Sequence, residues 1–270
     1  IHLIMYHTLE IQRDGAIATI WMNRPEVHNA FNAQLIADLA ESCRELDAEA
    51  ATRVVILAGR GKSFSAGADL NWMKAAGQAS VEANRADARR LAEMLRALAE
   101  LSKPTLARVH GAALGGGLGL AAACDLCVAA TGAVFATSEV RFGLVPATIS
   151  PYVIRAIGAR QAYRYFLTAE RIDAARARDL GLAHEVVAPE RLDARIARLA
   201  HELLQGGPEA LAASKDLIRA VANRAIDGGL VEETARRIAE QRATPQAAEG
   251  LAAFLEKRPP GWLECASDGR

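Results

Sequence analysis

The chain has 270 residues, of which 51% are hydrophobic and 24% charged, and its 32 basic side chains are matched by 32 acidic ones. This length and composition allow a large buried core, whereas a net charge of zero gives no electrostatic reason to expect nucleic acid or an anionic membrane as a partner. No apolar run approaches the roughly 20 residues that span a bilayer, and the first residues lack a basic leader followed by a long apolar segment, so we expect a cytoplasmic protein.

The first part of the chain is predicted to alternate strands and helices. Residues 7–23 alternate apolar and polar side chains around Asp14-Gly15, which predicts a β-hairpin. Residues 23–49 predict a loop and then a helix, because their apolar side chains recur at helical spacing. Residues 52–61 contain a short β-branched run that ends in glycines, and this pattern predicts a buried strand.

The middle of the chain continues the same alternation. Residues 81–104 place apolar side chains on one helical face and end in proline, which predicts an amphipathic helix. Residues 104–114 predict the next strand, and residues 124–130 and 133–139 predict two short ones. The chain from about Pro151 onward is rich in helical patterns. Strands that alternate with helices, followed by a helical region, predict an α/β protein.

The four cysteines, Cys43, Cys124, Cys127 and Cys265, are too few and too scattered for a disulfide scaffold. Cys124 and Cys127 form a C-x-x-C pair, a spacing found in metal and redox sites. Because no second pair lies nearby in the sequence, we expect small buried thiols and no metal site.

The stretch HGAALGGGLGLAAACD, residues 110–125, holds a glycine cluster that leads into an alanine-rich helix. Glycine costs about 1 kcal/mol relative to alanine inside a helix, so the cluster requires a reason. Residues 117–122 match the G-x-G-x-x-A spacing of dinucleotide-binding turns, and Glu139 lies about twenty positions downstream. Alternatively, a helix that opens with glycine presents free N–H groups to an oxyanion, or the small residues only permit close packing.

A second turn of small residues narrows these alternatives. GKSFSAGADL, residues 61–70, follows the strand predicted over residues 52–61. Together with the glycine cluster, this turn resembles the enoyl-CoA hydratase/isomerase (crotonase) family. The resemblance extends over nearly the whole chain, through the segments NRPEVHNAF (23–31), SEVRFGLVP (138–146), FLTAERIDAARARDLGLAHEVV (166–187) and AAFLEKRPP (252–260).

The resemblance implies a crotonase-like core, in which repeated ββα turns form a spiral over residues 1–190, and a helical trimerisation subdomain over residues 191–270. It implies an acyl-CoA thioester as the substrate, with coenzyme A as part of that substrate and no separate cofactor or metal. It also implies a homotrimer or a dimer of trimers. The dinucleotide interpretation of the glycines becomes the weaker one.

The resemblance also assigns the site residues. It implies that the backbone N–H groups of Ala68 and Gly116 form an oxyanion hole for the thioester oxygen and that Glu139 is the catalytic acid/base. Two of the expected substrate-binding residues, Phe254 and Lys257, would complete the nucleotide site of a neighbouring subunit. The full set of expected substrate-binding residues is Ala66, Leu70, Val27, Gly115, Phe254 and Lys257.

One position departs from the family pattern. Typical hydratases of this family carry a further glutamate two positions after the glycine triplet, where this chain has Gly119. A single carboxylate can move a proton between two carbons, which is double-bond isomerisation, or can hold a water together with another polar group. The candidates for that group are Thr137, Ser138, Ser150 and Tyr152.

The segment after Glu139 reads ATISPYV (147–153), where many family members have a glycine-rich run. In this respect the chain resembles methylglutaconyl-CoA hydratases of branched-chain breakdown, such as that of leucine. The sequence therefore predicts an enoyl-CoA hydratase for a short or branched 2-enoyl-CoA. The alternatives are an enoyl-CoA Δ3-Δ2 isomerase with Glu139 as the sole proton shuttle, and an acyl-CoA-binding protein with little catalysis. Arg141 is expected at the surface.

Overall fold

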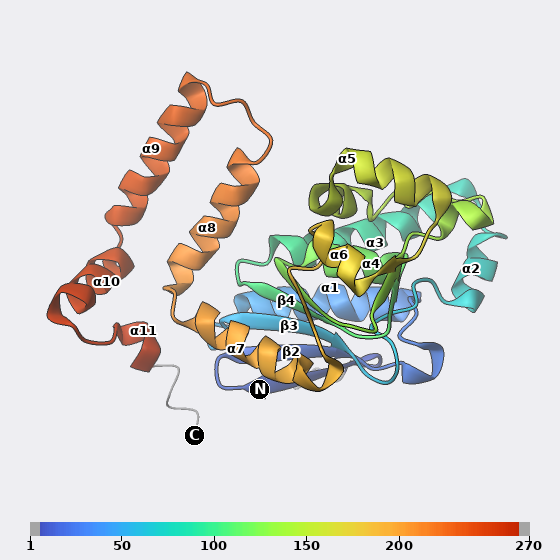
Figure 1. The fold of residues 1–270 in the computed structure, drawn as a ribbon, viewed down its shortest axis with the longest axis horizontal. Coiled ribbons are helices and arrows are strands. Elements are labelled where there is room, and N and C mark those ends of the chain that lie inside the picture. Colours follow the sequence, from blue (N-terminus) through green and yellow to red (C-terminus); the bar gives the residue numbers. More distant parts are fainter. Residues whose placement is uncertain (1–5, 265–270) are drawn as a thin grey trace.

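The computed structural model describes residues 6–264, and the fold is built on a six-stranded sheet (Figure 1). The two strands of the predicted hairpin pair antiparallel and join at Gly15, which adopts a positive φ of 54°. All other neighbours in this sheet are parallel. The strand order is β1 (Leu9–Asp14), β2 (Ile17–Met22), β3 (Val54–Gly59), β4 (Thr105–Val109), β6 (Leu126–Ala130) and β9 (Glu185–Val187).

Helices cover both faces of this sheet, which explains why its central strands are apolar throughout. In β3, Val55 and Leu57 belong to the core that lies against α1, α3 and α4. Val54 and Ile56 point to the opposite face and pack against α7, because successive side chains of a strand alternate. The helices concerned are α1 (Ala33–Ala48), α3 (Val81–Glu100), α4 (Gly116–Ala123) and α7 (Leu192–Leu204).

A small second sheet consists of β5 (Ala112–Leu114), β7 (Val134–Ala136) and β8 (Ile172–Asp173). The single strand predicted over residues 104–114 is therefore wrong, since the chain leaves the first sheet after β4 and enters the second at β5. The break falls at Gly111, whose φ is +58° and whose Cβ, if it had one, would lie 2.1 Å from the carbonyl oxygen of Lys62. Only glycine fits this corner, which brings β5 beside the turn that follows β3.

The remaining elements before α7 connect or cover the strands. The helix after the turn at residues 61–69 was not predicted. Asp69 caps its first turn, because its carboxylate accepts from the N–H groups of Asn71 and Trp72. α5 contains a kink at Gly158, where φ is +74°. These elements are η1 (Pro25–Val27), α2 (Leu70–Ala76), η2 (Glu139–Phe142), α5 (Ser150–Thr168), α6 (Ala174–Asp179) and η3 (Pro189–Arg191).

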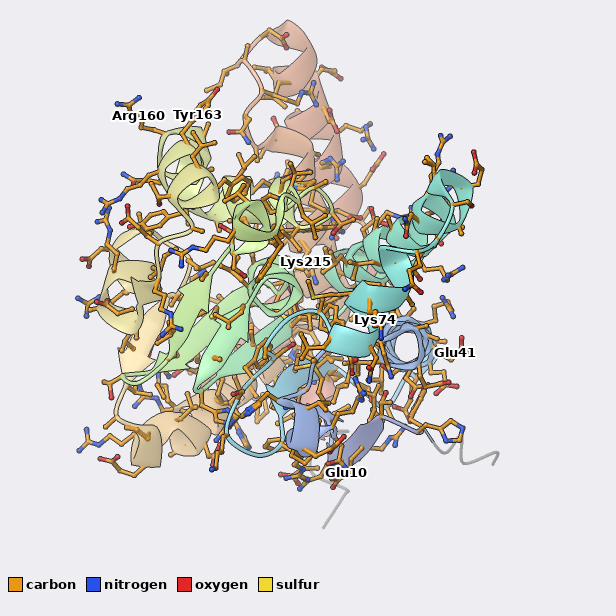
Figure 2. The ribbon with its side chains drawn as sticks, turned by 90° about the vertical axis from the view of Figure 1, so that its right-hand side faces the viewer. Glu10, Glu41, Lys74, Arg160, Tyr163 and Lys215 are labelled. Carbon is orange, nitrogen blue, oxygen red and sulfur yellow. The ribbon has the colours of Figure 1, made fainter. Side chains whose placement is uncertain are left out.

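The last helices project away from the sheets (Figure 1). They are attached to the core in part by Lys215, whose Nζ lies 2.6 Å from a carboxylate oxygen of Asp125 and 2.8 Å from the carbonyl oxygen of Lys103 (Figure 2). The division of the chain at residues 190/191 stays a prediction, although the helix that follows it, α7, packs on the sheet. The projecting helices are α8 (Pro208–Val221), α9 (Gly228–Arg242) and α10 (Pro245–Glu256). The last helix, α11 (Gly261–Glu264), returns to the core, where the Trp262 carbonyl accepts from the Arg53 guanidinium at 2.9 Å.

Three of the four cysteines are free and buried, which confirms the expectation of small core thiols. Burial raises the pKa of Cys43 and Cys127 to about 12 and raises that of Cys124 well above its usual value. These thiols therefore stay protonated at neutral pH and are poor nucleophiles. Cys265 lies outside the described residues. Among residues 6–264, no helix combines the length and the apolar character that crossing a membrane requires.

Candidate active site

Two turns that are far apart in the sequence lie against each other. The first follows β3 and comprises residues 65–69, and the second joins β5 to α4 at residues 114–116. The N–H group of Ser65 donates to the carbonyl of Ala112 at 2.9 Å, and the N–H group of Leu114 donates to the carbonyl of Ser65 at 2.9 Å. The small sheet thus holds the glycine cluster beside the first turn.

The first turn directs the N–H group of Ala68 away from Phe31, with which Ala68 forms an isolated β-bridge. The carbonyl of Gly67 accepts a hydrogen bond from the N–H group of Phe31 at 2.6 Å. In a trans peptide the C=O and the following N–H point in opposite directions, so the Ala68 N–H points away from Phe31. Gly67 permits this turn because its φ is +89° and because a Cβ would lie 2.8 Å from the carbonyl oxygen of Leu114.

The second turn presents the N–H group of Gly116. This residue is the first of α4, and the first N–H groups of a helix have no acceptor within the helix. The preceding residue, Gly115, has a φ of +49°, and its carbonyl accepts from the N–H group of Gly119 at 3.0 Å. The Gly116 N–H therefore points out of the helix start, where the helix dipole adds partial positive charge.

Glu139 lies beside this second turn, at the start of η2. Its Oε1 is 3.2 Å from the position that a Cβ on Gly115 would occupy. Its Oε2 is buried and accepts no hydrogen bond within the described part of the chain. Burial raises the pKa of Glu139 above its ordinary value of 4.5, and a hydrogen bond from its own backbone N–H partly opposes that shift. A half-buried carboxyl group that has one unpartnered oxygen and a raised pKa is typical of a residue that exchanges protons with a ligand.

The two turns and η2 bring the backbone N–H groups of Ala68 and Gly116 and the carboxyl group of Glu139 to one region of the chain. Two N–H groups can stabilise a negative oxygen that develops on a carbonyl compound. A carboxyl group beside them can remove or deliver a proton at an adjacent carbon. Together these groups could stabilise an enolate, and the roles expected for Ala68, Gly116 and Glu139 stay predictions.

We expect the substitution Glu139→Gln to stabilise the folded chain increasingly as pH rises. Because the folded-state pKa of Glu139 lies above the ordinary 4.5, the wild type loses stability as pH rises from the unfolded-state pKa through the folded-state pKa. Glutamine does not titrate and avoids that loss. Urea unfolding at about pH 5 and about pH 8 measures the gain in free energy of unfolding. A gain that is equal at both pH values would contradict the prediction.

The glycines of α4 pack against protein atoms, which excludes the dinucleotide interpretation. A Cβ on Gly117 would lie 2.4 Å from the carbonyl oxygen of Ser65, and one on Gly119 would lie 2.2 Å from Cγ2 of Ile149. A phosphate-binding turn needs glycine backbone that faces a ligand. Close packing is therefore the reason for these two glycines, whereas Gly116 retains a free N–H.

Gly119 packs against Ile149, at the position where the family pattern has a further glutamate. Gly115 directly precedes α4, and Gly119 lies within its first turn. Gly115 faces Glu139, and one turn later Gly119 faces Ile149, whose side chain is buried. The position at which a second glutamate was considered thus has no room for a side chain. An apolar isoleucine occupies the space instead.

Of the other expected substrate-binding residues, Ala66, Val27 and Leu70 lie in or next to the first turn, whereas Phe254 and Lys257 lie far from it in the sequence. Ala66 lies in the first turn, where its N–H donates to the carbonyl of His28 at 2.9 Å, and Val27 lies in the adjoining η1. Leu70 begins α2 and is 82% exposed. Phe254 and Lys257 lie at the end of α10, away from α4 within the same chain (Figure 1).

Two of the four polar residues expected to assist Glu139 donate their hydroxyl groups to backbone carbonyls instead. Thr137 donates its hydroxyl to the carbonyl of Tyr165 at 3.0 Å, and Ser150 donates its hydroxyl to the carbonyl of Ala147 at 2.8 Å. Burial raises the pKa of Tyr152, with a further contribution from Glu100 of α3. Arg141 is exposed, as expected.

Sequence reasoning overlooked Asn29, which organises the loop before the first turn. This residue is fully buried and has a positive φ of 54°. Its side-chain amide donates to the carbonyls of Arg60, Ser63 and Phe64 at 2.9, 2.9 and 3.2 Å. The available signal was the asparagine itself, because asparagine tolerates the left-handed region better than most residues.

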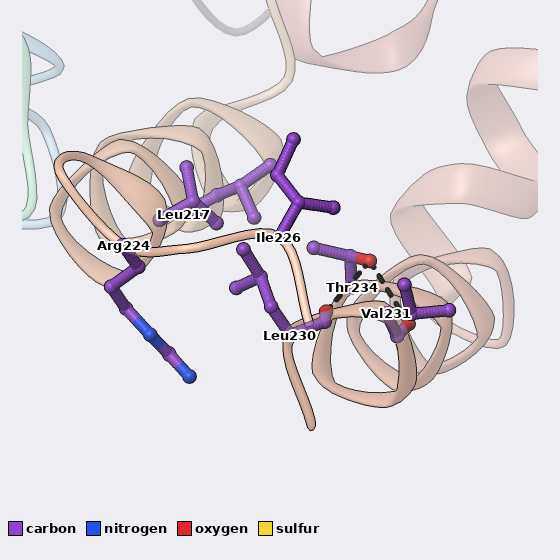
Figure 3. A pocket seen from close by; sticks show the side chains of 7 residues that line it. Leu217, Arg224, Ile226, Leu230, Val231 and Thr234 are labelled. Atoms are coloured by element: carbon purple, nitrogen blue, oxygen red, sulfur yellow. Dashed lines mark hydrogen bonds between the residues drawn. The ribbon is translucent and has the colours of Figure 1, made fainter. Parts of the chain in front are cut away.

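A separate hollow lies between α8 and α9 (Figure 3), and none of the expected site residues lines it. Its only charged lining residue is Arg224, which is paired with Glu233 at 2.7 Å. The hollow also lies apart from α4 in Figure 1. Its lining consists of Leu217, Val221, Arg224, Ile226, Leu230, Val231 and Thr234.

Known proteins resemble the chain over nearly its whole length. The enoyl-CoA hydratase/isomerase family matches residues 12–265. The crystal structure of an enoyl-CoA hydratase from Shewanella pealeana is 40% identical, with a TM-score of 0.93 and coverage of 95% of this chain and 96% of that one. A short-chain-enoyl-CoA hydratase from Clostridium acetobutylicum is 32% identical across 92% of this chain and 94% of its own length. A 4-chlorobenzoyl coenzyme A dehalogenase-2 from Arthrobacter sp. is 29% identical across 93% and 91%, respectively.

Proposed function

Because the chain belongs to the enoyl-CoA hydratase/isomerase family and has its crotonase-like fold, we propose that it is an enoyl-CoA hydratase, a hydro-lyase. Its substrate is an acyl-CoA thioester with a short or branched 2-enoyl chain. The observation that carries this proposal is the buried, unpartnered Oε2 of Glu139 beside the turn that presents the Gly116 N–H. The relatives' names include a dehalogenase as well as hydratases, so the choice of reaction depends on these site residues.

In the proposed reaction, the thioester oxygen accepts hydrogen bonds from the N–H groups of Ala68 and Gly116. The Glu139 carboxylate takes a proton from water while the water oxygen bonds to Cβ, and the electron pair of the double bond moves onto the thioester as an enolate. Glu139 then returns the proton to Cα, which leaves a 3-hydroxyacyl thioester and the original carboxylate. Each oxyanion donor contributes about 3 kcal/mol to transition-state stabilisation. Coenzyme A is part of the substrate, and no other cofactor takes part.

The packing of Ile149 against Gly119 favours isomerisation as the second candidate. With glycine at position 119, Glu139 is the one carboxylate of the proposed site, and the apolar side chain of Ile149 packs against Gly119. Glu139 can then remove a proton from Cα of a 3-enoyl thioester and return it to Cγ, which moves the double bond into conjugation. This reaction needs no bound water.

The absorbance of the conjugated enoyl thioester distinguishes these activities. We expect the chain to consume the absorbance of crotonyl-CoA or 3-methylglutaconyl-CoA, because hydration removes the conjugated double bond. An isomerase would instead create this absorbance from a 3-enoyl-CoA. If neither signal changes at high enzyme concentration while the thioesters still bind, the protein is an acyl-CoA-binding member with little catalysis.

We also propose that the chain forms a homotrimer or a dimer of trimers. Apolar side chains on the projecting helices support association, since Ile226 before α9 is 87% exposed and Phe254 of α10 is 80% exposed. A neighbouring copy would also bring Phe254 and Lys257 to the nucleotide end of the substrate. Sedimentation of the purified chain tests this assembly, and a monomer would contradict it. The cytoplasmic location remains a prediction.

A further inference from the structure

We propose that Arg24 and Asp69 form a positioning pair that holds the Ala68 N–H in the direction required for the thioester oxygen. This inference rests on the proposed function, because it assigns a role within the same two-amide site. An Nη atom of Arg24 lies 3.0 Å from Oδ2 of Asp69, and the two side chains are only 16% and 10% exposed. The pair joins the loop after β2 to the residue that directly follows Ala68.

Arg24 and Asp69 each form a further hydrogen bond to the segment at residues 30–31. The guanidinium of Arg24 also donates to the carbonyl of Ala30, so it bridges the strand-like segment at residues 30–31 and the first turn. The backbone N–H of Asp69 donates to the carbonyl of Phe31 at 2.9 Å. The other carboxylate oxygen of Asp69 caps α2 at the N–H of Asn71, 2.9 Å away.

These contacts surround the peptide that carries the Ala68 N–H. On one side of Ala68, the Gly67 carbonyl bonds to Phe31, and on the other side, the Asp69 N–H bonds to the same residue. Rotation of the 67–68 peptide would break the first bond and turn the N–H away from the site. The Arg24–Asp69 pair keeps the two segments together, and thereby prevents this rotation.

The Arg24–Asp69 pair does not touch the reacting atoms. Removing the ion pair should therefore destabilise the transition state only by displacing the Ala68 N–H. A misplaced donor stabilises the developing oxyanion less, whereas most contacts to coenzyme A remain. We expect Arg24→Gln and Asp69→Asn each to lower kcat by roughly 10- to 100-fold, with KM changed by less than about threefold. Asparagine still caps α2, so Asp69→Asn removes the ion pair without removing the helix cap. Arg24→Lys retains the charge and should recover part of kcat.

The carbonyl stretch of bound butyryl-CoA gives a readout that a purely structural role would not change. This saturated thioester does not react, and donated hydrogen bonds lower its C=O frequency. We expect the wild type to lower that frequency and Arg24→Gln and Asp69→Asn to lower it less. Arg195→Gln is the matched control, because Arg195 is 17% exposed and pairs with Glu185 at 2.6 Å on β9, outside the two turns. It should leave kcat and the frequency unchanged.

The outcomes separate this inference from the proposed function. The positioning role would be overturned if Arg24→Gln and Asp69→Asn both lower the carbonyl frequency of bound butyryl-CoA as much as the wild type does. It would also be overturned if both variants keep the kcat of the wild type. The same decrease of kcat in Arg195→Gln would overturn it as well, because general destabilisation would then explain the loss. If the wild type binds butyryl-CoA without any frequency shift, the two-amide site is wrong and the proposed function is overturned with it.

Discussion

Replacing Glu139 with glutamine should lower kcat by roughly 10²- to 10⁴-fold, the range typical of a lost general acid/base. Glutamine has nearly the same shape and fits the same space beside Gly115, but it neither accepts nor returns a proton. Both hydration and isomerisation depend on that exchange, so both activities should decrease. Binding of butyryl-CoA, which needs no proton transfer, should change little. Initial rates with saturating crotonyl-CoA, together with titration of butyryl-CoA, measure the two effects.

Glu170→Gln is the matched control for this substitution. Glu170 lies just after α5, and its partly exposed side chain is paired with Arg164 at 2.7 Å. The same chemical change at this position should leave kcat unchanged. Full activity of Glu139→Gln would show that another group transfers the proton, and the proposed mechanism would be wrong.

Introducing a carboxylate at the missing position should destabilise the chain instead of improving hydration. In Gly119→Glu the new Cβ would lie 2.2 Å from Cγ2 and 2.8 Å from Cβ of Ile149. Inserting atoms into a packed core costs about 1–3 kcal/mol, and a charged group buried there adds to that cost. We expect the free energy of unfolding to decrease by about 3 kcal/mol or more, measured by urea denaturation.

Gly132→Glu is the control, because no atom outside its chain neighbours lies within 4 Å of a Cβ placed there. This exposed substitution should change the free energy of unfolding by less than about 0.5 kcal/mol.

The double variant Gly119→Glu/Ile149→Ala should be more stable than the sum of its single variants predicts, because removing the isoleucine side chain makes room for the glutamate. Additive single effects, or a stable and more active Gly119→Glu, would contradict this account of the site.

The parts of the fold that were predicted correctly are those with a strong local pattern. The hairpin around Asp14-Gly15 and the helix at residues 81–100 follow from alternation and helical spacing alone. The strand at residues 104–114 was predicted as one element because its apolar residues are nearly continuous. Its break at Gly111 depends on the Lys62 carbonyl, a neighbour about fifty residues away that no local pattern contains.

The site divides in the same way. The sequence by itself determined the two small-residue turns and Glu139, because short motifs with a particular order and spacing identify the family. It also identified Gly119 as a departure, but not its consequence. Only the tertiary structure decided that Ile149 fills the space at Gly119 and that Arg24 pairs with Asp69. Both facts depend on contacts between segments distant in sequence, and packing determines such contacts only once the sheets and helices have assembled.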